Sequence, residues 1–207
     1  MTPDDHATLA TQLCETCQLF GERGWCRATS GNFSVRVGAE HCMITQSGRE
    51  KSALSLHDLM ICDLQGAARD AQYRSSAETP LHTCLYRLDA GIGAVLHTHS
   101  VAATVLSRSA ERKISISGFE MQKAIAGINS HEERLEIAVF DNTQDMEALA
   151  VIIENAWHAR QLKAHGFLIR GHGLYAWGRD LAEAKRHTEG LEFLIECLWQ
   201  ERLAASP

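Results

Sequence analysis

The stretch "AVLHTHS", residues 94–100, places two histidines one residue apart at the end of an apolar run. Side chains alternate along a strand, so His97 and His99 are expected to point to the same face. If 92–96 is the buried part of the strand, both rings lie near its C-terminal end, where sheet proteins commonly place functional polar groups. Imidazole is the commonest protein ligand of zinc. The pair alone also fits two histidines that only hydrogen-bond, so a third ligand is needed.

A third candidate ligand lies in the segment "RGHGLYAWG", residues 170–178, where His172 stands between Gly171 and Gly173. Glycines on both sides let the backbone bend and approach another group closely. By itself this segment is also explained as a hairpin tip with a solvated histidine. Together the two segments offer three nitrogen ligands with an open fourth position, which is typical of catalytic rather than structural zinc.

Around these segments the hydrophobic pattern alternates between helical and strand periods, which predicts one domain over 1–207 with helices layered on a partly antiparallel sheet. A capping residue, Ser76 or Thr79, is expected to start the helix that precedes the histidine strand. The expected helices are 5–20, 79–88, 101–107, 145–161 and 181–203, and the expected strands are 33–37, 42–45, 92–96, 114–116, 135–140, 167–169 and 174–177.

Composition limits the class of protein. With 207 residues, 45% hydrophobic and 22% charged, the chain has the make-up of a globular domain. A net charge of -6 argues against nucleic acid or an anionic membrane as the main partner and favours a small molecule. No apolar run is long enough to span a bilayer, and the polar start lacks the pattern of a signal peptide, so we expect a cytoplasmic protein.

The seven cysteines are odd in number and irregular in spacing, which predicts reduced, mostly buried thiols rather than a disulfide framework. Cys14 and Cys17 form a CxxC inside a helical pattern with Leu13 and Phe20. No second CxxC follows. Core packing is therefore favoured over a zinc or redox role for this pair.

Two glutamates are candidate acid/base groups: Glu78 in "SSAETPLH" and Glu120 in "SGFEMQKA". Each stands at an expected helix start, where the helix dipole favours a negative charge, so each by itself also has a structural explanation. The segments "ATSGNFSVR" (28–36) and "TQSGREKS" (45–52) are turns rich in small and hydroxyl residues that can offer hydrogen-bond donors to an oxyanion. Taken singly, they also fit ordinary turns.

The segments "TSGNFSVR", "ITQSG", "SSAE", "HTHS" and "GHG" occur in an order that resembles the class II aldolase and adducin-like family over nearly the whole chain. The resemblance implies a three-layer α/β/α fold with a central, largely antiparallel sheet, and tetramers with active sites at subunit interfaces. It implies one zinc ion per subunit on His97, His99 and His172, and a sugar-phosphate substrate. The substrate contacts that it implies are Gly31, Asn32, Ser47, Gly48 and Ser76.

The segment "GFEMQKAIAG" (118–127) is similar to the branch of this family that dehydrates methylthioribulose 1-phosphate in methionine salvage. This similarity implies that Glu120 is the acid/base and that Lys123 contacts the substrate, while Lys51 adds positive charge for the phosphate. Glu78 is either an additional metal ligand or a second acid/base. The alternatives within the fold are a fuculose-phosphate type aldolase, a pentulose-phosphate 4-epimerase and a non-catalytic adducin-like interaction module.

The expected chemistry follows from placing a 2-keto sugar phosphate at the metal, where the proton on C3 becomes acidic. Glu120 is then expected to take this proton and, once protonated, to help the C4 hydroxyl group leave as water. An aldolase would instead break the C3–C4 bond. A non-catalytic module would be expected to lack some of the three histidines and two glutamates, all of which are present here.

Overall fold

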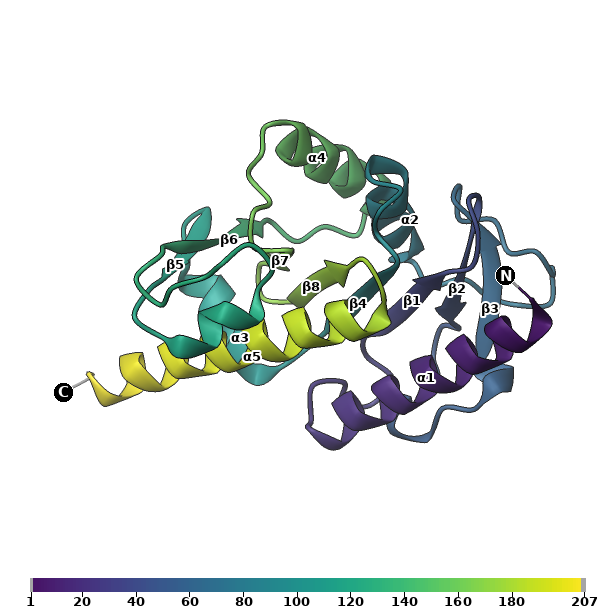
Figure 1. The fold of residues 1–207 in the computed structure, drawn as a ribbon, viewed down its shortest axis with the longest axis horizontal. Helices are drawn as coiled ribbons and strands as arrows, with labels where there is room; N and C mark the ends of the chain where they lie inside the picture. Colours follow the sequence, from purple (N-terminus) through teal and green to yellow (C-terminus); the bar gives the residue numbers. More distant parts are fainter. Residues whose placement is uncertain (1, 206–207) are drawn as a thin grey trace.

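The computed structural model describes residues 2–205 and has three layers, with helices on both faces of a central sheet (Figure 1). Its helices are α1 (Pro3–Glu22), α2 (Thr79–Leu88), α3 (Val101–Ser109), α4 (Met146–His158) and α5 (Leu181–Ala204), with the short 3-10 helices η1 (Lys51–Ala53), η2 (Leu56–Asp58) and η3 (Glu120–Ala124). Its strands are β1 (Asn32–Arg36), β2 (His41–Thr45), β3 (Leu59–Asp63), β4 (Ala94–Thr98), β5 (Lys113–Ile116), β6 (Leu135–Phe140), β7 (Gly166–Ile169) and β8 (Gly173–Gly178).

The described strands form one eight-stranded sheet in the order β3-β2-β1-β4-β8-β7-β6-β5. Every neighbouring pair is antiparallel except β6 and β7, which α4 connects as a crossover. The expectation of a largely antiparallel sheet between helical layers is therefore confirmed. The strand with the histidine pair, β4, lies near the middle of the sheet between β1 and β8.

Three apolar clusters hold the layers together. One face of the sheet packs against α2 and α4, with Leu81, Leu85 and Ile153 in its core. The opposite face packs against α1 beside β1 and β2 and against α3 and α5 beside β5 to β8, as Figure 1 shows. Because β4 is covered on both faces, all five of its residues are buried. Close packing on both sides therefore holds the backbone in place where the histidines emerge.

Two local expectations were wrong. The strand β3 was not expected, because its five residues form a short edge strand whose pattern alone does not distinguish it from a loop. Neither Ser76 nor Thr79 caps α2: Glu78 occupies the N-cap position without a capping hydrogen bond. The Ser76 hydroxyl instead accepts a hydrogen bond from the Glu78 N–H at 3.3 Å, forming a local turn before the helix.

The interpretation of the cysteines is confirmed by burial. Cys14 and Cys17 pack in the apolar cluster between α1 and β1. All seven cysteines of the described residues are free, and only Cys197 is partly exposed. Among residues 2–205, no helix combines the length and the apolar character that crossing a bilayer requires.

Candidate metal centre

His97 and His99 emerge together where β4 ends. Their ring centroids are 4.5 Å apart, so the two rings lie on the same side of the strand, as the spacing predicts. His97 belongs to β4, and His99 follows directly beyond its last residue, Thr98. The His99 N–H donates to the Trp25 carbonyl oxygen at 2.7 Å, which fixes the backbone at this point.

The turn between β7 and β8 brings His172 to the same place. Its ring centroid lies 5.0 Å from that of His97 and 4.6 Å from that of His99. Gly171 has a φ of 64°, and a Cβ at residue 173 would lie 2.0 Å from the Thr98 carbonyl oxygen. Glycine at both positions therefore lets the turn close against the end of β4.

Glu78 completes the group. Its Oε1 lies 2.9 Å from His172 Nε2 and 3.4 Å from His97 Nε2, and its side chain is 14% exposed. One ligand atom from each of Glu78, His97, His99 and His172 lies within 4.8 Å of the others. A negative charge at the start of α2 thus faces three imidazoles from two other segments of the chain.

The nitrogen atoms of this group fit a small divalent cation. His97 Nδ1 donates to the Leu174 carbonyl oxygen at 2.9 Å, so its Nε2 atom faces the group. The Nε2 atoms of His97 and His172 are 3.3 Å apart, and tetrahedral ligands about 2.0–2.1 Å from zinc lie about 3.3 Å from each other. His99 Nε2 is buried and has no hydrogen-bond partner among the described residues, so this atom is available to bind a metal ion.

The protonation states favour metal binding as well. Burial, together with the neighbouring His97 and His172, lowers the pKa of His99 to about 3, so this ring is neutral and can offer a lone pair. Burial opposes ionisation of Glu78, but the His97 and His172 rings outweigh it and hold the pKa of this carboxyl well below its usual range. The group therefore presents a carboxylate at Glu78 and a neutral imidazole at His99, the forms that coordinate metals.

Some of the predicted substrate contacts adjoin this centre. Asn32 begins β1 directly opposite His97 in the sheet. Gly31, with a φ of 78°, precedes it, and a Cβ there would lie 2.8 Å from the His97 carbonyl oxygen. The Asn32 amide donates to Glu78 Oε2, and its nitrogen lies 3.5 Å from the Ser76 hydroxyl. These contacts bring Gly31, Asn32 and Ser76 together beside Glu78.

The remaining turn lies next to these residues. The Ser47 N–H donates to the Arg74 carbonyl oxygen at 3.3 Å, which ties the exposed turn at Ser47 and Gly48 to the segment before Ser76. Lys51 is only 1% exposed, and its Nζ donates to the carbonyl oxygens of Thr29 at 3.2 Å and of Arg49 at 2.7 Å. Burial lowers the pKa of this ammonium. Its positive charge thus lies behind both turns.

Glu120 and Lys123 are not part of this group. They lie on η3, which packs against α5, and their side chains form an ion pair of 2.7 Å. The Glu120 side chain is 70% exposed, and His131 Nδ1 lies 3.4 Å from its other carboxylate oxygen. Within this chain the predicted acid/base therefore faces solvent rather than the histidines.

Two residues around the centre were missed by sequence reasoning. The Tyr175 ring stacks on the His97 ring at a centroid distance of 3.9 Å. His82 is fully buried, and its Nε2 hydrogen-bonds Asn32 Oδ1. A signal for His82 existed, because it follows Glu78 by four residues and thus lies on the same face of the helix.

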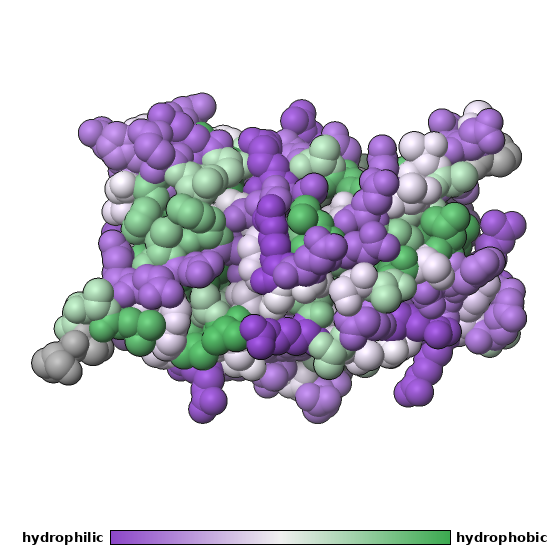
Figure 2. All heavy atoms as spheres, turned by 90° about the horizontal axis from the view of Figure 1, so that it is seen from below, coloured by the Kyte–Doolittle hydropathy of each residue, from purple (hydrophilic) through white to green (hydrophobic). Residues whose placement is uncertain are grey.

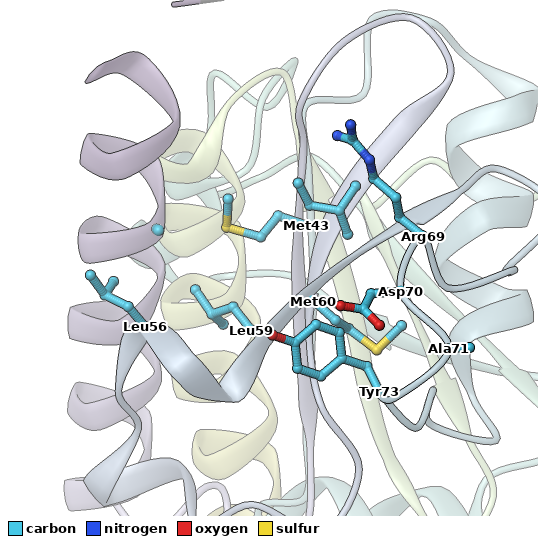
Figure 3. A pocket seen from close by; sticks show the side chains of 10 residues that line it. Met43, Leu56, Leu59, Met60, Arg69, Asp70, Ala71 and Tyr73 are labelled. Carbon is cyan, nitrogen blue, oxygen red and sulfur yellow. The ribbon is translucent and has the colours of Figure 1, made fainter. Parts of the chain in front are cut away.

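A hollow of about 590 Å³ lies elsewhere, between the edge strand β3 and α1, and Figure 3 shows the side chains around it. Its wall includes the apolar side chains of Met43, Leu59 and Met60 and the ring of Tyr73, with the charged Arg69 and Asp70 beside them. None of the predicted site residues lines this hollow. This hollow is therefore separate from the group of histidines.

Comparison with known proteins agrees with the geometry. The family model described as "Class II Aldolase and Adducin N-terminal domain" matches residues 11–199. A methylthioribulose-1-phosphate dehydratase from Marinobacter nauticus is 50% identical over 93% of each chain. One from Pectobacterium atrosepticum is 48% identical over 93% of this chain and 94% of its own.

Solved structures show the same fold. An L-fuculose-1-phosphate aldolase from Thermus thermophilus superposes with a TM-score of 0.76 at 28% identity, covering 95% of this chain and 96% of its own. Another L-fuculose 1-phosphate aldolase gives a TM-score of 0.78 at 23% identity, covering 100% and 90%. With the motif order, the sheet topology and the family model all in agreement, the chain belongs to the class II aldolase and adducin family.

Proposed function

We propose that this protein removes water from 5-methylthioribulose 1-phosphate to give 2,3-diketo-5-methylthiopentyl 1-phosphate, a step of methionine salvage. The observation that carries this proposal is the convergence of Glu78 with three imidazoles in a chain that is 50% identical to a methylthioribulose-1-phosphate dehydratase over 93% of its length. The presence of all four of these side chains also argues against a non-catalytic module of the same fold. The single sheet formed by the described strands supports one domain over residues 1–207.

The proposed cofactor is one zinc ion per subunit, held by His97, His99 and His172, with Glu78 as the fourth ligand before substrate binds. The ligand spacing, the orphaned His99 Nε2 and the neutral His99 ring support this assignment. Bound zinc would supply Lewis acidity that polarises the substrate oxygens and makes the C3 proton acidic. Cobalt, nickel or iron also suit imidazole ligands, so metal analysis of the purified protein tests the choice.

The phosphate group is proposed to lie against the two turns that adjoin the centre. Gly31 and Gly48 shape these turns through their positive φ angles, and Ser47 and Ser76 add hydroxyl groups. Lys51 places its buried positive charge behind them. This arrangement holds the phosphate by donors and charge while the other end of the sugar reaches the histidines.

Glu120 is proposed to move the proton, and to do so in the site of a neighbouring subunit. Its carboxylate would take the proton from C3, and the electron pair left at C3 would expel the C4 hydroxyl group, which leaves as water with that proton. The enol that remains rearranges to the diketone. Lys123 holds Glu120 on the surface of η3 and is proposed to contact the same substrate.

Exposed apolar side chains near η3 support an oligomer. Met121 on η3 and Phe193 on α5 are exposed, and Phe119, Phe193 and Cys197 line a hollow of about 600 Å³. Figure 2 shows the face that carries α1 and α5, on which hydrophobic patches lie among polar side chains. We propose a homotetramer, as the family resemblance implies, in which η3 of one subunit approaches the histidines of the next.

A mixing experiment tests the shared site. His97→Ala and Glu120→Gln would each be inactive alone, because one lacks a metal ligand and the other lacks the base. In mixed oligomers, about one quarter of the sites would combine an intact His97 with an intact Glu120 from the neighbour, and activity would return. If Glu120 serves its own chain, no site in the mixture is complete and no activity returns.

The substrate is tested by product analysis. Zinc-loaded protein is incubated separately with methylthioribulose 1-phosphate and with fuculose 1-phosphate, and the products are identified by mass. Loss of one water with the carbon chain intact supports the dehydratase. The second candidate is an aldolase, which the similarity to L-fuculose-1-phosphate aldolases supports. An aldolase would cleave fuculose 1-phosphate to dihydroxyacetone phosphate and an aldehyde.

A further inference from the structure

A buried chain of hydrogen bonds runs from the core of the molecule to Glu78. His82, on α2, is fully buried. Its Nε2 hydrogen-bonds Asn32 Oδ1, and its Nδ1 lies 2.7 Å from the Ser34 hydroxyl. That hydroxyl lies 2.8 Å from the hydroxyl of Tyr86. At the other end, the Asn32 amide donates to Glu78 Oε2.

The direction of every bond in this chain follows from its end at Glu78. A carboxylate only accepts, so the Asn32 NH₂ group faces Glu78 and its Oδ1 faces His82. Oδ1 also only accepts, so His82 Nε2 carries a proton. Burial, with His97 nearby, lowers the pKa of His82 to about 3, so this ring is neutral and its Nδ1 accepts.

The remaining two hydroxyl groups are then determined as well. The Ser34 hydroxyl donates its only proton to His82 Nδ1. The Tyr86 hydroxyl therefore donates to the Ser34 oxygen. With His82 neutral, one arrangement of protons satisfies the whole chain, and every donor in it points from the core towards Glu78.

We propose that His82 is a positioning residue that fixes the side-chain amide of Asn32, so that Asn32 holds the Glu78 carboxylate at the histidines. Without the His82 N–H, the Asn32 amide is free to turn and present its oxygen to Glu78, which repels the carboxylate. The Asn32 amide group thus always donates to Glu78, and Asn32 connects the turn at Gly31 to the metal centre. The metal readout below rests on the proposed metal site, whereas the proton arrangement does not depend on it.

The first test measures the protonation of His82 directly. In ¹⁵N-labelled protein without metal, two-bond ¹H–¹⁵N correlation spectra distinguish the Nε2–H tautomer, the Nδ1–H tautomer and the doubly protonated ring. We expect His82 as neutral Nε2–H throughout neutral pH, identified by the loss of its signals in His82→Gln. A ring found as the Nδ1–H tautomer overturns the inference, because its Nε2 then has no proton to donate to Asn32 Oδ1.

The second test asks whether His82 acts through Asn32. Zinc affinity of the metal-free protein is measured by competition with a chromophoric chelator for His82→Phe, Asn32→Ala and the double variant. We expect His82→Phe to weaken zinc binding about 10- to 100-fold, the range found for outer partners of metal ligands. In the Asn32→Ala background the same substitution should have no further effect. Equal weakening in both backgrounds would show that His82 acts through packing.

Two more variants complete the design. His82→Gln keeps an N–H that can reach Asn32 Oδ1 and should restore most of the affinity. Tyr86→Phe is the matched control, because it removes a buried hydroxyl but leaves the Ser34 donor to His82 intact; its zinc affinity should be unchanged. Where His82→Phe does not fold, Ser34→Ala replaces it in the cycle. If the protein proves not to be a dehydratase, the expected results of all these experiments remain the same.

Discussion

Glu192 on α5 offers a measurable link between pH and stability. Its side chain is 2% exposed, the Thr98 hydroxyl donates to its Oε1, and its Oε2 has no hydrogen-bond partner. Burial raises the pKa of Glu192 from 4.5 to about 7, although contacts with Ser100 and Thr98 oppose this shift. The folded protein therefore keeps this carboxyl neutral over a pH range in which the unfolded chain ionises it.

The sign of the effect follows from proton binding. Between pH 4.5 and about 7 the unfolded state binds one proton fewer than the folded state, so the free energy of unfolding falls as the pH rises. At 1.36 kcal/mol per pH unit the total loss is about 3 kcal/mol, of which roughly 2 to 3 kcal/mol falls between pH 5 and pH 8. The contribution is fully present below pH 4.5 and is lost by the time the pH has passed 7.

Glu192→Gln removes this dependence, because the amide mimics the neutral carboxyl and still accepts from Thr98. Urea unfolding of both proteins is measured from pH 5 to pH 8, with a chelator and at one protein concentration. Between pH 5 and pH 8, we expect the free energy of unfolding of the variant to rise by roughly 2 to 3 kcal/mol relative to that of the native protein. Glu201→Gln, an exposed position on the same helix, is the control. A difference between native protein and Glu192→Gln that stays constant with pH would refute the reasoning.

Three further outcomes are expected. His97→Ala should lose metal and activity together, measured by metal analysis and turnover, because it removes one of three nitrogen ligands; full activity would remove His97 from the site. Glu120→Gln should keep its zinc but lose turnover, since an amide does not accept the proton, and unchanged turnover would exclude Glu120 from the mechanism. Gly173→Ala should lower the free energy of unfolding by about 1 to 3 kcal/mol or more, because a Cβ there lies 2.0 Å from the Thr98 carbonyl oxygen; a denaturation curve like that of the native protein would contradict this.

Much of the fold could be predicted because its signals are local. The alternation along residues 94–98 and the two glycines around His172 identified the segments that carry the histidines. The helices were found from their period, although α2 begins differently because Ser76 makes a turn rather than a cap. The edge strand β3 escaped detection, because its strand conformation depends on pairing with β2.

The position of the two glutamates was decided by tertiary structure. As residues at helix starts, Glu78 and Glu120 carry the same local signal. The packing of α2 against the sheet turns Glu78 towards His97 and His172, whereas η3 leaves Glu120 in solvent beside Lys123. No local pattern distinguishes these environments, because each depends on segments far away in the sequence.

The sequence by itself determined which residue types are available and where the chain bends: the histidine pair, the glycine-flanked His172 and the apolar faces of the helices. Only the tertiary structure decided that these groups meet, that Asn32 and His82 hold Glu78 in place, and that Glu192 is buried beneath Thr98. The physical reason is that periodicity and backbone freedom act over a few residues, whereas distance, burial and the direction of hydrogen bonds are set by segments that only the folded sheet brings together.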